Sequence, residues 1–496
     1  MKRNLFITCL IATVLTFSAC DSYLDIVPKG ESTLNKTSDY IGMLETPYGF
    51  PLGNEWYLCG EYAPAYVEEI SNYTNPVLSA CFLWDENYDR AAYMTSTGSD
   101  DMYTMCYEKI SRYNIIIDNI SDAEGSDADK VMGIAQAKIL RAYNYFFLIN
   151  TYAKPYDPAT ANQERGIILR KEFNLEEEGV QGTVEDAYRL IQQDIEDAIP
   201  NLPHKAISTF HPDKSFGYAL KAKVHLFKRE IDQALQSSLD CIKEAEGAAN
   251  HKLWNMNADY RNLLDKYKNY MNMGTMPDMM FEYGMAMYNM MRMMGIMLYF
   301  EHGYEDPENL LYQHGLNFMS PQAALVRKPV LDLFDKKTDL RYTFAMGTTS
   351  DGPSTAEPGC TFINVMSFRW NCAGLKLSEV YLMAAECYAR KGDMANTVKY
   401  LNDLRKNRII NTYYQDLPEP ADIAAAMKVV REERKRELLF TSNGFFDMRR
   451  FCTEFNETLT REFENNTYTL KPTSHLLTFP FPVAAMQNSN LIQNSK

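Results

Sequence analysis

The sequence lacks the motifs by which common enzyme classes are recognised. It contains no G-x-S-x-G, no H-E-x-x-H, no phosphate-binding glycine loop and no dinucleotide fingerprint. Histidine is scarce, with 7 in 496 residues, and the spacing of His302 and His314 from nearby acidic residues fits no metal motif. We therefore predict no cofactor, no metal site and no catalytic residue. A glycoside hydrolase remains the alternative, because it needs only two carboxylates and the chain has 65 acidic residues.

Basic residues are also in the minority. The 50 Lys and Arg residues stand against 65 Asp and Glu residues, a formal charge of −15, which argues against a protein that binds nucleic acid through its phosphates. Gly and Pro number 24 and 21, too few for a collagen-like or low-complexity chain. With 46% apolar residues, the composition is that of a globular protein.

The ten cysteines include no C-x-x-C pair, which excludes a zinc ribbon and a thioredoxin-like site. Cys387 lies on an apolar helical stripe and is expected to be a small buried hydrophobe. Only Cys360 and Cys372 are close enough in sequence to suggest a bridge, and the disulfide state stays open. Residues 271–297 contain twelve methionines, which we interpret as a malleable core and loop rather than a copper site or a partner surface.

The first residues have the pattern of an export signal. Lys2 and Arg3 precede an apolar run at residues 5–17, followed by Ser18, Ala19 and Cys20. The run is too short for a membrane span of about 20 residues. We predict a signal peptide at residues 1–19. The Ser-Ala-Cys sequence resembles a bacterial lipobox, which would make Cys20 the lipidation site and tether the chain to a membrane; the alternative is ordinary cleavage.

Several segments have apolar residues at spacings of three and four, the pattern of a helix packed on one face. Thr183 and Asp186 form a capping pair before one of them, and Gly392 followed by Asp393 separates two others. The predicted helices cover residues 135–149, 184–198, 219–226, 231–242, 377–388, 394–404 and about 422–440.

The helix pair at residues 377–404, with Ala384, Tyr388, Gly392 and Asp393, resembles a tetratricopeptide unit, and residues 219–246 form a weaker copy. The fold class is predicted to be all-α. Because the units lie far apart in sequence, we expect a helical scaffold rather than a continuous solenoid. Acidic and basic residues at helical spacing within residues 431–450 are expected to pair with one another for structure; they are Glu433, Arg434, Glu437, Asp447, Arg449 and Arg450.

Two segments, residues 45–107 and 250–320, are rich in Tyr and Trp and keep no clean helical period. Long irregular insertions on a regular scaffold are where function usually lies.

Motifs along most of the chain resemble the SusD/RagB family of Bacteroidetes surface lipoproteins. The opening Cys20-Asp-Ser-Tyr-Leu-Asp-Ile-Val-Pro28 is similar to the family's start, and residues 107–120 and 137–146 resemble two of its helices. The most specific matches are residues 375–386, the Gly392-Asp393 turn, residues 401–405 and the charged helix at residues 433–450. Phe479-Pro-Phe-Pro482 resembles the closing motif. Thr441-Ser-Asn443 departs from the usual Glu-Gly turn, at a place expected to lie away from the binding region.

The resemblance implies a helical body with tetratricopeptide units on one side and binding loops on the other. It also implies a partner, an outer-membrane TonB-dependent transporter of the SusC type, to which the protein hands oligosaccharides or, in some members, peptides. The expected regions are the signal at 1–19, an N-terminal SusD-like region at 20–250, a second aromatic and Met-rich region at 251–330 and a C-terminal region at 331–496.

A sugar binder needs flat aromatic side chains for the apolar faces of sugar rings and polar side chains for the hydroxyls. For each candidate, the competing interpretation is ordinary core packing. From the first aromatic segment the candidates are Trp56, Tyr57, Tyr62, Trp84 and Tyr88, with Asn54, Asp85, Asn87 and Arg90 as polar partners. From the second they are Tyr283, Tyr288, Tyr299 and Tyr304.

The leading hypothesis is a non-enzymatic, lipid-anchored glycan binder on the outer membrane that feeds a SusC-like transporter. The alternatives are a glycoside hydrolase, a peptide-binding member of the family, and a pure interaction protein that uses the tetratricopeptide surface.

Overall fold

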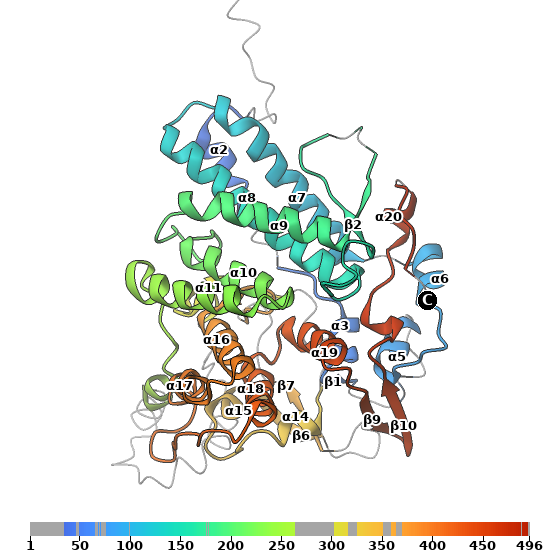
Figure 1. Cartoon of the computed structure of the whole chain (residues 1–496), viewed down its shortest axis with the longest axis vertical. Coiled ribbons are helices and arrows are strands. Elements are labelled where there is room, and N and C mark those ends of the chain that lie inside the picture. Colours follow the sequence, from blue (N-terminus) through green and yellow to red (C-terminus); the bar gives the residue numbers. More distant parts are fainter. Residues whose placement is uncertain are drawn as a thin grey trace, which may run out of the picture.

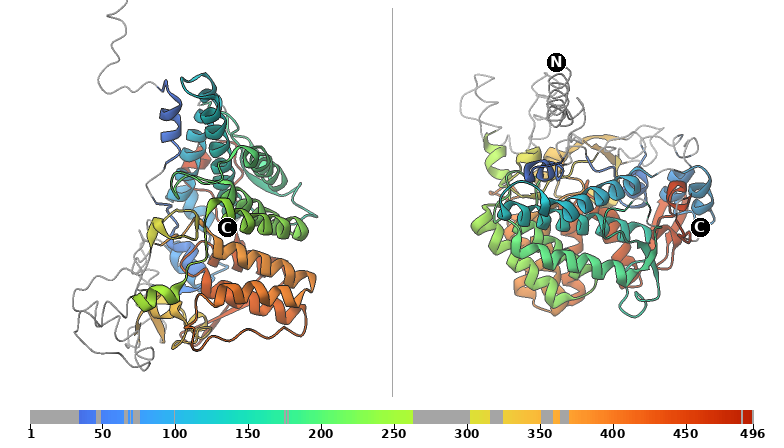
Figure 2. Two further views of the ribbon diagram at one scale, coloured as in Figure 1. Left: turned by 90° about the vertical axis from the view of Figure 1, so that its left-hand side faces the viewer. Right: turned by 90° about the horizontal axis from the view of Figure 1, so that it is seen from above.

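Paired α-helices are stacked along one side of the molecule (Figures 1 and 2). The computed structural model describes residues 34–45, 49–64, 68, 70, 76–98, 100–174, 176, 178–262, 302–315, 325–350, 359–363, 370–487 and 489–494. The stacked helices are α7 (Asp101–Asn119), α8 (Asp127–Tyr152), α9 (Val184–Ala198), α10 (Lys214–Phe227), α11 (Ile231–Glu244), α16 (Leu377–Lys391), α17 (Met394–Arg405) and α18 (Ile423–Glu437).

The predicted caps set the ends of these helices. At α9, the Thr183 hydroxyl accepts a hydrogen bond from the Asp186 amide, and the Asp186 carboxylate accepts one from the Thr183 amide. Gly392 ends α16 with a φ of 77°, a left-handed conformation that favours glycine. The Asp393 carboxylate then accepts a hydrogen bond from the Asn396 amide and begins α17. The predicted helix boundaries are therefore confirmed at these positions.

The tetratricopeptide-like pairs pack against one another, although they lie far apart in sequence. Helix α11 of the first pair packs against α16 of the second. On α16, the small residues Ala385 and Ala389 are fully buried in a cluster with Leu401 and Leu404 of α17 and Val430 of α18. The prediction of a mainly helical scaffold is confirmed. The two pairs are separated in sequence and yet belong to one scaffold, in agreement with the expectation of a helical scaffold rather than a continuous solenoid.

The other elements form the opposite side of the molecule. The helices there are α2 (Thr37–Gly42), α3 (Asn54–Cys59), α5 (Pro76–Leu83), α6 (Arg90–Ser96), α14 (Lys328–Leu331), α15 (Leu340–Ala345), α19 (Asn443–Glu454) and α20 (Val483–Gln487). A small antiparallel sheet has the order β1 (Tyr62–Ala63), β5 (Leu325–Val326), β7 (Cys360–Ile363), β6 (Met346–Ser350). Three two-stranded sheets pair β2 (Arg165–Ile168) with β3 (Gln181–Thr183), β4 (Asn309–Leu311) with β8 (Leu375–Lys376), and β9 (Leu459–Phe463) with β10 (Asn466–Leu470).

The first aromatic segment is more helical than its sequence pattern predicts. Its described residues include α3, α5, α6 and the start of α7. Helix α5 has buried side chains on most of its circumference, among them Val77, Leu78, Ala80, Cys81 and Phe82. A helix enclosed in this way has no polar face and so shows no helical period. The prediction of irregular structure is wrong for this part.

A group of buried ion pairs connects α16, α18 and α19. Glu386 of α16 accepts two hydrogen bonds of 2.6 Å from Arg450, and also pairs with Arg390. Arg434 binds the Asp447 carboxylate through two nitrogens, at 2.7 and 3.0 Å. Burial alone would raise the pKa of Glu386, but the charges of Arg450 and Arg390 lower it well below its usual range. The expected structural pairing within this charged segment is therefore present for Arg434, Asp447 and Arg450.

Glu433 and Glu437 have partners outside the segment. Arg341 of α15 contacts both, at 2.7 and 2.9 Å, and Arg408 contacts Glu437 at 2.7 Å. Arg449 donates to backbone carbonyls rather than to a carboxylate, those of Leu477 and Ala153. These contacts fix α18 and α19 to the loops behind them.

The eight cysteines that follow Cys20 are all buried and unbonded to one another. Cys360 and Cys372 thus form no bridge. Among the described residues no group of His, Cys, Asp or Glu is placed to hold a metal ion. None of the helices in the described ranges combines the length and the apolar character that a membrane span requires. The methionine-rich residues 271–297 lie outside the described part.

The Glu386→Gln substitution is expected to destabilise the fold by about 3 kcal/mol, because it leaves buried guanidinium groups without their carboxylate. Asp232→Asn is the matched control: it removes an acid from a pair with Lys391 in which the Asp232 side chain is 77% exposed, and should cost below about 1 kcal/mol. Urea unfolding of both variants measures the difference. Equal stability of the two would contradict a structural role for the buried pairs.

Candidate functional site

A cavity of about 730 Å³ opens where α18 and α19 meet the elements on the side opposite the stacked helices. Its walls come from five places in the sequence: the turn between α3 and β1, Trp84 after α5, the start of α14, the α18–α19 pair and strand β9. This volume falls within the range of known small-molecule sites. Its lining includes Gly60, Glu61, Tyr62, Trp84, Arg327, Lys328, Asp332, Arg431, Arg434, Lys435, Phe440, Thr441, Asn443, Gly444, Asp447, Met448, Phe451, Arg461 and Glu462.

The α18–α19 pair provides one wall. Arg431, Arg434 and Lys435 reach the cavity from α18 because residues three and four apart share a helix face. After α18 the chain reverses at Phe440, which has a φ of 67°. The Phe440 amide donates a 2.6 Å hydrogen bond to the Tyr62 hydroxyl. This bond joins the reversal to β1 on the opposite wall.

Arg461 of β9 holds the floor of the cavity. Its side chain is 1% exposed, and it donates to the carbonyls of Leu58 (3.0 Å), Cys59 (3.2 Å), Gly60 (2.7 Å) and Phe82. Its guanidinium also lies 4.2 Å from the centre of the Trp84 ring. The turn after α3 has few backbone partners of its own, and Arg461 supplies the donors that its carbonyls need.

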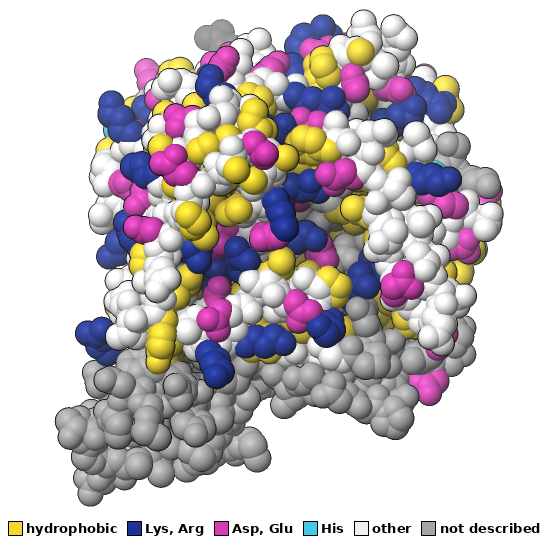
Figure 3. All heavy atoms as spheres, turned by 60° about the horizontal axis from the view of Figure 1, so that its bottom comes forward, with side chains coloured by type: hydrophobic (Ala, Val, Ile, Leu, Met, Phe, Trp, Pro, Cys, Tyr) yellow, Lys and Arg dark blue, Asp and Glu magenta, His cyan; other side chains and the backbone are white. Residues whose placement is uncertain are grey.

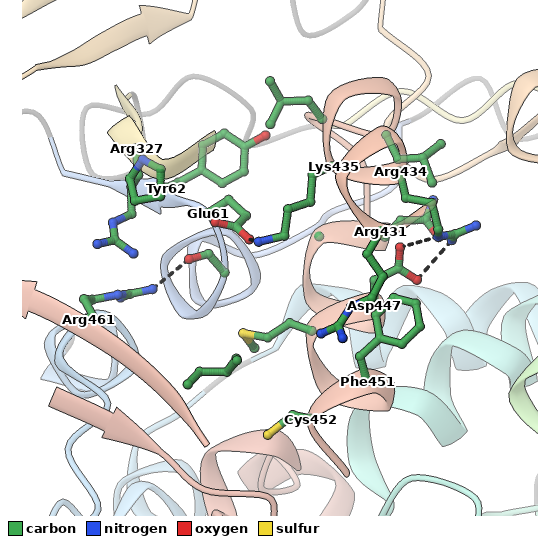
Figure 4. A pocket seen from close by; sticks show the side chains of 18 of the residues that line it. Glu61, Tyr62, Arg327, Arg431, Arg434, Lys435, Asp447, Phe451, Cys452 and Arg461 are labelled. Carbon is green, nitrogen blue, oxygen red and sulfur yellow. Dashed lines mark hydrogen bonds and ion pairs between the residues drawn. The ribbon is translucent and has the colours of Figure 1, made fainter. Parts of the chain in front are cut away.

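Ion pairs cross the mouth of the cavity. Figure 4 shows Glu61 and Lys435 pointing toward each other from opposite walls, and their charged atoms are 2.6 Å apart. Arg431 binds Glu457 through two hydrogen bonds of 2.7 and 2.5 Å. Burial would raise the pKa of Glu61, but the charges of Lys435, Arg327 and Arg461 lower it below its ordinary value.

Nearby arginines also lower the pKa values of Asp447 and Glu457. Burial would raise the pKa of Asp447, and Arg434 with Arg450 lowers it. The hydrogen bonds from Arg431 lower the pKa of Glu457. The positive charges in and behind the walls therefore outweigh desolvation at each of these three carboxylates.

Three of the predicted ligand-binding residues belong to the core instead. Trp56 is 3% exposed and packs against Phe445 and Phe446, with ring centres 5.2 and 4.9 Å away. Tyr57 is buried beside Tyr62. Arg90 is fully buried and donates to the carbonyls of His475 and Thr478. The prediction that these side chains face a ligand in solvent is wrong, because they fill the interior between α3 and the C-terminal segment.

Two other candidates, Tyr62 and Trp84, do line the cavity. Both are nearly buried, at 3% and 6% exposure, so neither presents an open ring face. The Trp84 indole donates a 3.0 Å hydrogen bond to the Cys59 carbonyl. The two residues are thus part of the cavity wall, and the prediction of flat exposed platforms is wrong for them.

The remaining candidates lie elsewhere. Asp85, Asn87 and Tyr88 lie at or near the surface after α5, and Tyr304 is 55% exposed beside Phe210; none of the four lines the cavity. Asn54 begins α3, and its side chain lies outside the described part. Tyr283, Tyr288, Tyr299 and Cys20 also lie outside the described residues, so their predicted roles stay predictions.

Sequence reasoning missed most residues of the cavity. Arg327, Arg431, Lys435 and Arg461 carry no local motif, and the chain brings them together from three separate segments. Thr441 and Asn443 also line the cavity. The expectation that their turn lies away from a binding region therefore does not hold for this cavity.

Two comparisons of the sequence with protein families match parts of the chain. Residues 59–226 match a family of the SusD-like type described as starch-binding and associating with the outer membrane, and residues 371–490 match the SusD family. Together the two matches cover more than half of the chain. The protein belongs to the SusD/RagB family. Members of this family bind carbohydrate and associate with the outer membrane. No curated protein matches the sequence of this SusD-like chain.

Solved structures of SusD-like proteins share the fold of this family member. A SusD superfamily protein from Bacteroides thetaiotaomicron has a TM-score of 0.66 at 16% identity, over 93% of this chain and 100% of its own. A SusD-like carbohydrate-binding protein from Bacteroides vulgatus has a TM-score of 0.57 at 16% identity, over 92% and 98%. A laminarin-binding SusD-like protein has a TM-score of 0.61 at 16% identity, over 93% and 99%.

The Arg461→Gln substitution is expected to destabilise this SusD-like protein by about 3 kcal/mol, since it removes the buried donors of several carbonyls. Arg189→Gln is the control, because the Arg189 side chain is 70% exposed and should contribute below about 1 kcal/mol. Denaturant unfolding gives both values. An Arg461 variant as stable as the wild type would mean that the floor of the cavity does not depend on this side chain.

Proposed function

We propose that this protein is a non-enzymatic glycan-binding lipoprotein of the cell surface, which delivers oligosaccharides to a SusC-like TonB-dependent transporter. The observation that carries the proposal is the family match, together with a cavity of ligand size in a fold shared with carbohydrate-binding proteins. The laminarin-binding relative supports a glycan as the class of ligand.

The cavity suits capture by hydrogen bonding in a shaped recess. Its lining combines aromatic and apolar side chains, such as Trp84, Phe440 and Leu439, with guanidinium, carboxylate and amide groups. Sugar rings offer apolar faces and a rim of hydroxyls, and this mixture of groups matches both. The aromatic residues act as parts of the wall rather than as exposed platforms.

Two of the cavity carboxylates, Glu61 and Asp447, are unsuited to the acid step of glycoside hydrolysis. A glycosidase needs one carboxylic acid that stays protonated near neutral pH, so its pKa must be raised. Glu61 and Asp447 have lowered pKa values and are held in ion pairs with Lys435 and Arg434. Neither is suited to act as the general acid, which supports a role in binding.

Gly444 gives a direct test of the cavity. A Cβ atom added there meets nothing within 4 Å, and the residue lines the cavity near the start of α19. Gly444→Phe should therefore fill the space without disturbing the core. We expect it to weaken oligosaccharide binding by roughly tenfold or more.

The matched control is Gly247→Phe, also at a position with open space but away from the cavity. Isothermal titration with an oligosaccharide panel measures binding, and chromatography of the incubated sugars detects shorter products. Retention without products, lost only in the Gly444 variant, agrees with the proposal. Undiminished binding in that variant would place the glycan site elsewhere, and shorter products would favour the hydrolase.

The lipid anchor is tested at Cys20. Cells that express the wild-type chain should incorporate radioactive palmitate into the protein, and a Cys20→Ala variant should incorporate none, because acylation requires the thiol. Gel autoradiography with equal protein loading measures the label. Equal labelling of the two chains would end the lipoprotein assignment and would leave ordinary cleavage.

A further inference from the structure

The cavity is locally basic in an acidic protein. Six of its lining side chains are cationic, Arg327, Lys328, Arg431, Arg434, Lys435 and Arg461, against four acidic ones, Glu61, Asp332, Asp447 and Glu462. The whole chain carries a formal charge of −15. Figure 3 looks onto this face, where the surface is hollowed and Lys and Arg side chains lie beside the hollow. The sign of the local charge is thus opposite to that of the molecule.

The pKa values of the acidic residues in and beside the cavity reflect the local electrostatic potential. Glu61 and Asp447 lie in surroundings where burial raises a carboxyl pKa, yet nearby cations lower the pKa of both. A carboxylate is therefore stabilised at these positions in spite of desolvation. An anionic group of a ligand would experience the same field, since the potential does not depend on which molecule carries the charge.

Two cations at the mouth are accessible to a ligand. The Lys435 side chain is 48% exposed and that of Arg431 is 27% exposed. They lie four residues apart on α18, so they share a face of the helix. Lys435 carries three donors and shares one ion pair with Glu61, which leaves room for a second acceptor. Deeper in the cavity, the buried Arg461 side chain adds positive charge.

We propose that the cavity receives the charged group of an acidic sugar, the carboxylate of a uronic acid or the sulfate of a sulfated residue, beside Lys435 and Arg431. This inference rests on the proposed glycan-binding function and narrows its ligand class. The net negative charge of the chain repels polyanions at a distance. A locally basic recess then selects an oligosaccharide with few charges placed at the cavity.

Two substitutions test the proposal, one at each partner of the Glu61–Lys435 ion pair. They change the charge of the cavity in opposite directions. Lys435→Gln removes a cation at the mouth and should weaken binding of an acidic oligosaccharide about five- to tenfold. Glu61→Gln removes the competing carboxylate and should tighten it about threefold. For a neutral oligosaccharide the two variants should not shift binding in opposite directions, because the ligand carries no charge that responds to the lost cation or carboxylate. Lys399→Gln on α17, whose side chain is 57% exposed and paired with Asp403, is the matched charge control.

The ligands are oligogalacturonate, a chondroitin sulfate oligosaccharide and neutral laminari-oligosaccharide, titrated into the full mature chain at about 50 and about 500 mM NaCl. Circular dichroism confirms that each variant is folded. Preference for an acidic sugar, weakened by salt and shifted in opposite directions by the two variants, supports the proposal. Binding of oligogalacturonate shows that a carboxylate suffices, whereas binding of only the chondroitin sulfate oligosaccharide, which carries both groups, points to the sulfate.

Two results would overturn the inference. If neutral sugar binds and both acidic sugars do not, the ligand class is wrong while the glycan-binding function stands. If acidic sugars bind but the Lys435 variant behaves like the Lys399 control, the charged group binds elsewhere. If no sugar binds at all, the proposed function itself fails.

Discussion

Buried arginines that donate to backbone carbonyls hold together the segments opposite the helix layer and join them to the end of α8. The segments opposite the helix layer have short strands and turns, so many of their carbonyls have no partner in regular structure. Arg461 reaches the turn after α3, Arg449 reaches the end of α8 and the C-terminal segment, and Arg90 reaches that same segment. Each guanidinium presents several donors in a fixed plane. One side chain can therefore satisfy several carbonyls and fix segments that are distant in sequence.

The charge of these arginines has a consequence for the cavity. Carbonyl dipoles stabilise a buried guanidinium without changing its net charge. A bound carboxylate, by contrast, cancels most of the electrostatic potential of a guanidinium at a distance. Arg461 donates to the carbonyls of Leu58, Cys59 and Gly60, and its charge helps to lower the pKa of Glu61 at the mouth. The contacts that hold the floor in place are therefore also a source of the positive field in the recess. Stability and ligand preference are linked through one residue.

The helix layer could be predicted from the sequence, and the cavity could not. Helices α9 and α17 each bury one face. The caps at Thr183, Gly392 and Asp393 are local signals for the ends of α9, α16 and α17, so short windows contain the required information. The aromatic residues are ambiguous because Tyr and Trp serve equally in a core and in a binding site. Trp56 fills the core, and only the contacts of its neighbours decide this. The cavity depends on residues from several separate segments, which no window of sequence brings together.

The reversal between α18 and α19 shows how a small local departure acts on the cavity. Phe440 adopts a φ of 67°, a conformation that costs a non-glycine residue energy. The strain is offset because the Phe440 amide bonds to Tyr62 and its ring packs against Trp370. The residues that follow, Thr441 and Asn443, then turn toward the cavity. This turn is the place where the chain departs from the usual Glu-Gly of the family. Within the turn the Thr441 hydroxyl donates to the Leu438 carbonyl and the Asn443 amide donates to the Glu379 carboxylate, so these local hydrogen bonds, together with that of Phe440, hold this part of the cavity wall in place.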